Sequence, residues 1–164
     1  MEYQLLFDAS RQGYAWWMPA LGLGLLAFEL LLWKQRRQIP FRRELVFVFL
    51  VFSILFTASL TIAAFTGSYG YYTKVQNRIS AGQYQITEGP ITNFQPGGVD
   101  GSKVESFAVN NVTFRYNAAD AGNPGFKSES GLGGPLNNGL YVRVAYFYDP
   151  ERDQNIILKL EVRK

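Results

Sequence analysis

The sequence contains no cysteine and no histidine among its 164 residues. It therefore lacks a thiolate nucleophile, an imidazole base and the usual nitrogen and sulfur ligands of zinc, copper and haem. An enzyme built from this chain would depend on carboxylates alone, and no pair of them has a spacing that indicates general acid–base catalysis. We therefore expect no enzymatic activity, no metal site and no cofactor.

Charge is also scarce, at 18% of the residues, and the positive excess is confined to one segment. Residues 34–44 carry five basic side chains against one acid, whereas residues 67–164 carry ten basic against nine acidic side chains. A nucleic-acid-binding domain clusters its basic residues on a folded surface. We therefore expect no nucleic-acid partner.

Two long apolar runs dominate the first part of the chain. Residues 14–33 contain a single charge, Glu29, and residues 45–66 contain none. Each run is long enough to cross a hydrocarbon core of about 30 Å, which predicts two transmembrane helices. A cleaved signal peptide is the alternative for the first run, but residues 1–13 carry a net charge of −1 and no basic n-region.

The residues that flank the two runs predict their orientation. Cytoplasmic loops are enriched in Lys and Arg, which places the loop 34–44 in the cytoplasm and both the tail 1–13 and the chain after residue 66 outside. The expected location is a bacterial inner membrane, with a periplasmic C-terminal domain. The side chains expected at the lipid interfaces are Tyr14, Trp16, Trp17, Trp33, Arg36, Arg37, Arg42 and Arg43.

Small residues recur at helical spacing on both predicted helices. Stripes of this kind let helices approach closely, so the two runs are expected to pack as an antiparallel hairpin. The alternative is that the small residues face lipid. The stripes are Ala20, Gly24 and Ala27 on the first helix, and Ser53, Thr57, Thr61 and Ala64 on the second.

Glu29 falls on the side of the first helix opposite the small stripe, together with Gly22. A carboxylate near the interface can snorkel toward Arg36 or water. Alternatively, it contacts another membrane subunit, because a carboxylate directed at lipid is costly. The partner expected here is another integral membrane protein or complex, or a second copy of the chain. The candidate contact residues are Glu29, Gly22, Ser53, Thr57 and Thr61.

The chain after the second run reads as a short stalk, 67–81, followed by a β domain, 82–164. Four segments near residues 106–109, 112–116, 142–148 and 156–162 alternate apolar and other residues, as half-buried strands do. Asn110-Asn111 predicts a tight hairpin between the first two. A first strand, 83–94, is bent at Gly89-Pro90. A long bent strand followed by four more predicts a five-stranded OB-like or SH3-like barrel.

Two parts of the β domain are candidates for binding. The 23-residue connection 117–139 holds six Gly and two Pro, and loops this long are usually functional or disordered. Its candidate residues are Phe126, Gly133, Gly134, Asn137 and Asn138. On the strand near residue 144, Tyr141, Arg143 and Phe147 alternate away from the core and form a candidate partner surface. Three acids at 149, 151 and 153 resemble a calcium loop only in spacing, and we interpret them as an ordinary polar turn.

Several sequence motifs follow one another in a characteristic order in the predicted β domain. The succession GQYQITEGPITNF, ESFAVNNVTFRY, GGPLNNGLYVRVAY and IILKLEV resembles a family of small uncharacterised bacterial inner-membrane proteins, which join N-terminal transmembrane helices to a C-terminal β domain. The likeness covers about residues 82–162, and the polar, Gly-rich stretch between Phe94 and Val104 departs from it. It implies a fold and a location but no activity. The recurring positions are Gly89, Phe94, Phe107, Phe114, Tyr116, Gly125, Phe126, Gly133, Gly134 and Gly139.

Two functions fit these expectations. The first is a non-enzymatic accessory subunit that docks through its helix hairpin on a larger membrane complex, since Glu29 is expected to point away from the hairpin seam. The second is a ligand-sensing barrel that controls oligomerisation of the transmembrane helices, as in a stress or defence effector.

Overall fold

The computed structural model describes residues 2–35, 43–97, 104–116, 125–126 and 136–164. The chain forms two compact units. One is Tyr14–Tyr71, and the other combines Met1–Gly13 with Tyr72–Lys164. We call them the helix hairpin and the β domain.

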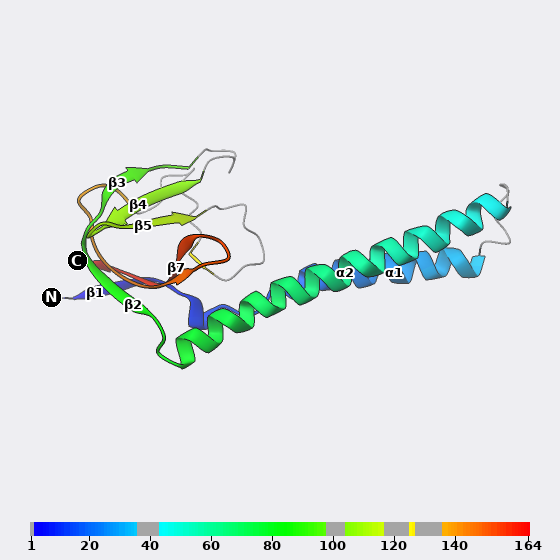
Figure 1. Ribbon diagram of the computed structural model, residues 1–164, viewed down its shortest axis with the longest axis horizontal. Helices are drawn as coiled ribbons and strands as arrows, with labels where there is room; N and C mark the ends of the chain where they lie inside the picture. Colours follow the sequence, from blue (N-terminus) through cyan, green and yellow to red (C-terminus); the bar gives the residue numbers. More distant parts are fainter. Residues whose placement is uncertain (1, 36–42, 98–103, 117–124, 127–135) are drawn as a thin grey trace. The chain divides into compact units, whose positions relative to one another are not determined.

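Two helices are long and apolar enough to cross a membrane, as the two apolar runs predict. They are α1, Trp17–Gln35, and α2, Arg43–Ser80 (Figure 1). With 38 residues, α2 is roughly 57 Å long at 1.5 Å per residue, well beyond a single crossing. The predicted stalk is thus the continuation of the same helix. The helix ends at Ser80, and the turn after it contains Gly82, whose φ of 65° is readily adopted by glycine and whose amide donates to the Ile79 carbonyl at 3.1 Å.

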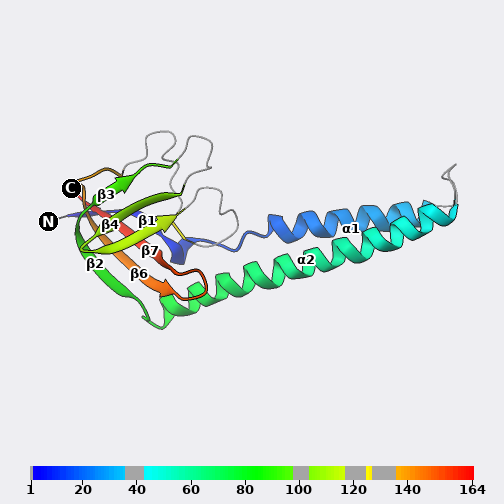
Figure 2. The same cartoon turned by 45° about the horizontal axis from the view of Figure 1, so that its top comes forward.

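The β domain is a mixed sheet of seven strands (Figure 2). The strand order is β2-β6-β7-β5-β4-β3, and β1 also pairs with β7. Only the β5–β7 pair is parallel among the pairs described. A short 3-10 turn, Ala9–Arg11, follows β1. The strands are β1 Tyr3–Asp8, β2 Gln85–Pro90, β3 Thr92–Gln95, β4 Glu105–Val109, β5 Val112–Tyr116, β6 Tyr141–Asp149 and β7 Gln154–Arg163.

The predicted five-stranded OB-like or SH3-like barrel is wrong, because the sheet has seven strands and does not close into a barrel. The expected first strand does bend, but it divides at Ile91 into β2 and β3, which occupy the two ends of the strand order and are not paired with each other. A side-chain hydrogen bond links β2 to the turn between β4 and β5: Asn110 donates to the Glu88 carbonyl at 2.7 Å. A Cβ on Gly89 would come within 2.9 Å of Asn110 Oδ1, so a larger residue there would displace the Asn110 side chain.

The strand β1 comes from residues 1–13, the segment for which the sequence predicts only an extracytoplasmic N-terminal tail. Tyr3 pairs with Arg163 and Asp8 with Lys159, antiparallel to β7, with a register shift between Leu5 and Phe7. The segment escaped detection because Leu5 and Leu6 are consecutive, which breaks the apolar–polar alternation of a half-buried strand.

The core of the β domain agrees with the predicted alternation. Asn110 and Asn111, with φ of 47° and 67°, form the expected hairpin turn. Phe107 lies opposite Phe114, with ring centroids 5.1 Å apart. The buried apolar cluster consists of Ile91, Phe107, Val109, Phe114, Tyr116, Phe126, Leu136, Val142, Val144, Tyr146, Ile157 and Leu160.

Candidate functional site

The seam of the helix hairpin is lined by Glu29. One oxygen, Oε1, accepts hydrogen bonds from Ser53 Oγ at 2.6 Å and Thr57 Oγ1 at 2.9 Å. About two helical turns before Glu29, Gly22 lies against Thr61, where an added Cβ would come within 2.7 Å of the threonine methyl. The second helix therefore packs through Ser53, Thr57 and Thr61 of the predicted stripe, whereas Ala64 is exposed.

The first helix uses the opposite face from the one predicted. Ala20, Gly24 and Ala27 are exposed, and Glu29 points into its own hairpin rather than away from it. The reason is that a carboxylate is better satisfied by two hydroxyls than by lipid. The expectation that Glu29 points away from the seam is therefore wrong, whereas a contact of the hairpin with another membrane subunit stays a prediction.

Removing the Glu29 carboxylate should weaken the hairpin only moderately. Hydrogen bonds between membrane helices contribute about 0.6 kcal/mol on average, so Glu29→Ala should lower hairpin stability by about 1 kcal/mol. In this variant the Ser53 and Thr57 hydroxyls can instead donate hydrogen bonds to the backbone carbonyls four residues earlier, as the Thr61 hydroxyl already does to the Thr57 carbonyl. Reversible unfolding in mixed micelles would measure the loss, with Ser59→Ala, whose hydroxyl bonds only Leu55, as the control. A loss no larger than the control's would contradict a bonded seam.

Aromatic side chains gather at both ends of the hairpin. The Tyr14 ring packs edge-on against Trp16, Phe65 and Tyr69, and its hydroxyl lies 2.7 Å from Ser68 Oγ. At the other end, the Trp33 and Phe47 rings are 5.2 Å apart. Trp17 is exposed. These pairings suit amphipathic rings at two lipid interfaces. Of the basic residues predicted there, Arg43 begins α2, while Arg36, Arg37 and Arg42 lie outside the described residues.

On the outer face of β2, β6 and β7, Arg143 is held by neighbouring side chains. Its Nε donates to Glu88 Oε2 at 2.8 Å, and the guanidinium lies 4.2 Å from the centre of the Tyr3 ring. The Tyr3 hydroxyl donates to the other oxygen of Glu88. Both hydrogen bonds stabilise the ionised carboxylate and so hold the pKa of Glu88 below its ordinary value. The bond from Tyr3 is the larger cause. Arg143 is thus part of an ion-paired cluster.

Replacing Tyr3 with phenylalanine should raise the pKa of Glu88 toward that of a free glutamate, because the variant loses the hydrogen bond that lowers it most. A carboxyl with a depressed pKa stabilises the fold at neutral pH, and this contribution disappears as the pH falls through the folded-state pKa. The acid-induced loss of stability should therefore shrink in Tyr3→Phe. NMR titration of the Glu88 carboxyl would measure the shift. Tyr84→Phe, on the same domain without a Glu88 contact among the described residues, is the matched control. An unchanged Glu88 pKa would contradict the assignment.

The other two members of this predicted surface are partly covered. Phe147 is buried, and the Arg78 guanidinium of α2 lies 5.5 Å from its ring centre. Tyr141 is half-buried, with Arg163 at 5.0 Å from its ring centre. A register shift between Ala145 and Tyr146 interrupts the alternation on which the prediction relied. The expected open face of Tyr141, Arg143 and Phe147 is therefore not present as such.

The loop candidates have structural positions where they are described. Phe126 belongs to the core and packs against the rings of Phe7 and Tyr116. Asn138 Oδ1 accepts a hydrogen bond from the Phe94 amide at 2.9 Å, and the Asn137 carbonyl accepts one from Leu140. Gly133 and Gly134 lie outside the described residues.

A buried ion pair joins the end of α2 to the sheet. Asp149 is completely buried, and Lys74 Nζ lies 2.9 Å from its Oδ1 and 3.1 Å from Glu151 Oε1. The Glu151 amide also donates to Asp149 at 3.3 Å. The sequence predicts only an ordinary polar turn for this segment. The feature that could have indicated the ion pair is Lys74, which is the first charged residue after Glu44 in the sequence.

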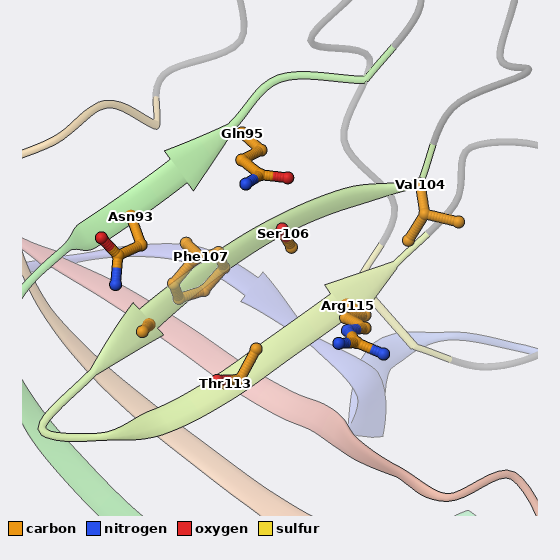
Figure 3. A pocket seen from close by; sticks show the side chains of 8 residues that line it. Asn93, Gln95, Val104, Ser106, Phe107, Thr113 and Arg115 are labelled. Atoms are coloured by element: carbon orange, nitrogen blue, oxygen red, sulfur yellow. The ribbon is translucent and has the colours of Figure 1, made fainter.

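A polar cavity lies on β3, β4 and β5 and has a volume of about 430 Å³ (Figure 3). Gln95, Ser106 and Arg115 are neighbours across the three strands and form one row. Asn93 and Thr113 also line the cavity. We call these five residues the polar pocket. Sequence reasoning missed it, although Thr113 and Arg115 alternate with the buried Phe114 and so had to face outward.

The polar pocket has no carboxylate among the described residues that line it. The Arg115 side chain is exposed and has neither an ion pair nor a hydrogen bond with any described residue. No group of three acidic side chains suited to a metal occurs in the part of the chain that the structure describes. The pocket can therefore supply neutral hydrogen-bonding groups and one positive charge.

Comparison with protein-family models, with curated proteins and with solved structures finds no match for this chain. The resemblance to a family of small inner-membrane proteins stays a prediction.

Proposed function

We propose that the protein is a non-enzymatic, membrane-anchored sensor whose β domain lies on the periplasmic face of a bacterial inner membrane. The order of elements supports this topology. β1 precedes both helices and β2 follows them, yet both strands belong to one sheet. A chain that returns to the same sheet must cross the membrane an even number of times. The five basic residues of the loop 34–44 favour a cytoplasmic location for the connection between α1 and α2, on the side of the membrane opposite the β domain.

The observation that carries the sensor proposal is the continuity of α2. Its last turns belong to the β domain, where Val75 is buried and Lys74 pairs with the buried Asp149. Its first turns form the hairpin seam through Ser53 and Thr57. A continuous helix is the kind of rigid element through which a change in one unit can bias the other. The bound ligand would change the association of hairpins from two copies.

The accessory-subunit function has weaker support, because Glu29, the residue expected to contact another subunit, accepts hydrogen bonds through Oε1 from Ser53 and Thr57 of its own hairpin. It remains the competing proposal. Its clearest sign would be a different membrane protein that co-purifies at constant stoichiometry.

Cysteine cross-linking can test the sensor proposal, since the natural chain contains no cysteine and gives no background. Phe52 is 67% exposed, whereas the neighbouring Ser53 faces Glu29. We expect Phe52→Cys to form disulfides between copies in native membranes and Ser53→Cys to form none. Adding Lys74→Met to Phe52→Cys should change the yield, because it weakens the junction of α2 with the sheet. Absence of cross-links, with a stoichiometric foreign partner in mild detergent, would favour the accessory function instead.

A further inference from the structure

We propose that the polar pocket is the ligand site of the β domain and that it binds an acidic saccharide, with the ligand carboxylate on Arg115. This inference rests on the proposed sensor function and names the class of its ligand. It combines the register of three strands, the backbone at Asn93 and the composition of the pocket.

The strand register brings the polar groups together. Ser106 pairs with Gln95 on one side and with Arg115 on the other, so an amide, a hydroxyl and a guanidinium stand side by side. Thr113 lies two residues before Arg115 on β5 and therefore faces the same way. Figure 3 shows the side chains of Gln95, Ser106 and Arg115 projecting from their three strands. The volume of about 430 Å³ lies in the range of roughly 300–1,000 Å³ found for small-molecule sites.

A β-bulge places the fifth group. The pairing of β3 with β4 is irregular between Thr92 and Gln95, and Asn93 there has a φ of 52°. Bulges re-aim a side chain, and a left-handed non-glycine residue costs conformational energy. Here the result is that the Asn93 amide joins the pocket that Gln95 already lines. Asparagine tolerates this backbone conformation better than most residues.

Charge indicates an anion on the ligand. Arg115 has no acidic partner among the described residues, and a guanidinium binds a carboxylate or a phosphate through two parallel hydrogen bonds. One positive charge matches a carboxylate better than a phosphate monoester, which carries about −1.5 to −2 at neutral pH.

The remaining groups indicate a polyhydroxylated body. Carboxamides and hydroxyls both donate and accept hydrogen bonds, as sugar hydroxyls require. The aromatic ring that lines the pocket, Phe107, is only 1% exposed, so it offers no face on which a nucleobase could stack. Val104 and Ala108 supply a small apolar surface for the C–H groups of a sugar ring.

Binding can be measured on the full chain in nanodiscs of zwitterionic lipid by isothermal titration calorimetry. The probes are a short oligogalacturonate, a neutral oligogalactoside of the same length, inorganic phosphate, and vesicles containing phosphatidylglycerol. We expect only the oligogalacturonate to bind to the natural chain. Arg115→Gln should weaken that binding at least about tenfold, because it removes a charge-assisted bond.

Two further variants make the test specific. Lys164→Gln removes the same charge from an exposed terminal residue and should change affinity by less than about twofold, since distant exposed charges are screened. Asn93→Gly keeps the left-handed backbone accessible, removes the amide and should weaken binding about fivefold. Thermal unfolding would confirm that each variant is folded. Arg115 is exposed, so its replacement should leave the fold intact.

The pocket assignment is overturned if oligogalacturonate does not bind, if the neutral oligosaccharide binds as well, or if Arg115→Gln binds like the natural chain. Tighter binding of phosphate or of anionic vesicles would also overturn it and would identify a phosphate or lipid headgroup as the ligand. The oligomeric mass of the same samples tests the sensor function separately. Specific binding without any change in mass would leave the site standing and remove the proposed control of oligomerisation.

Discussion

Replacing Lys74 with methionine is expected to destabilise the β domain by about 3 kcal/mol. Asp149 is completely buried, and the variant removes its closest cation, 2.9 Å away. The Arg152 guanidinium, 4.0 Å from the other carboxylate oxygen, replaces only part of that interaction. A buried charge that loses its partner keeps its full desolvation cost. This is the largest effect that we expect from a single substitution outside the hydrophobic core.

Chemical denaturation of the full chain in micelles, followed by a probe in the sheet, would measure the Lys74→Met effect. Lys164→Met is the matched control and should change stability by less than about 0.5 kcal/mol. The double variant Lys74→Met/Asp149→Asn should recover part of the loss, because a neutral amide costs less to bury than a carboxylate. A single variant as stable as the control would show that the ion pair is not structural.

Substituting Gly22 with alanine should separate the helices of the hairpin and cost about 1–3 kcal/mol, as overpacking of a tight contact does. The added methyl would lie 2.7 Å from the Thr61 methyl and 3.0 Å from its Cβ. The Thr61 hydroxyl is bonded to the Thr57 carbonyl at 2.7 Å, so the side chain cannot turn away without losing that bond.

Gly24→Ala provides the matched control, since an added Cβ there would meet nothing within 4 Å. The same change should be neutral or slightly stabilising at Gly24, because alanine favours the helix. Thr61→Ala combined with Gly22→Ala should recover much of the loss. Reversible unfolding in mixed micelles would compare the four proteins. Equal stability of Gly22→Ala and Gly24→Ala would rule out the close approach at Gly22.

The sequence was most informative where one physical requirement dominates. Long apolar runs predict helices of membrane length because few other structures use them. The helices α1, Trp17–Gln35, and α2, Arg43–Ser80, contain most of the two runs, and α2 continues through the predicted stalk. Two consecutive asparagines between alternating segments predict a hairpin, and Asn110-Asn111 form it. The interruption predicted at Gly89-Pro90 occurs one residue later, at Ile91, after Pro90 has completed the regular pairing of β2 with β6.

The errors arose where the outcome depends on a partner far away in the sequence. Either the small stripe of α1 or the face that carries Glu29 could pack against α2. The Glu29 face does so, because its carboxylate accepts hydrogen bonds from the hydroxyls of Ser53 and Thr57. Phe147 was misplaced because a register shift in β6 leaves no mark in the local pattern. The burial of Asp149 could not be predicted locally, because its ion-pair partner, Lys74, lies on α2.

The polar pocket could be predicted from the sequence only in part. Alternation alone places Thr113 and Arg115 on the outer face of β5. Whether Gln95 and Ser106 stand beside them depends on which strands pair, and the bulge at Asn93 depends on the register between β3 and β4. Candidate residues on one strand could therefore be predicted, whereas their assembly across three strands could not.

The pairing of β1 with β7 has a consequence for the order of folding. β1 is synthesised before both helices and β7 after them, and the Lys164 amide donates to the Glu2 carbonyl. Closing so long a loop is entropically costly for a free chain. The hairpin removes much of this cost, because Tyr14 already lies 2.7 Å from Ser68 once α1 and α2 have packed. Assembly of the hairpin should therefore precede completion of the sheet, and β1 should dock last among the strands.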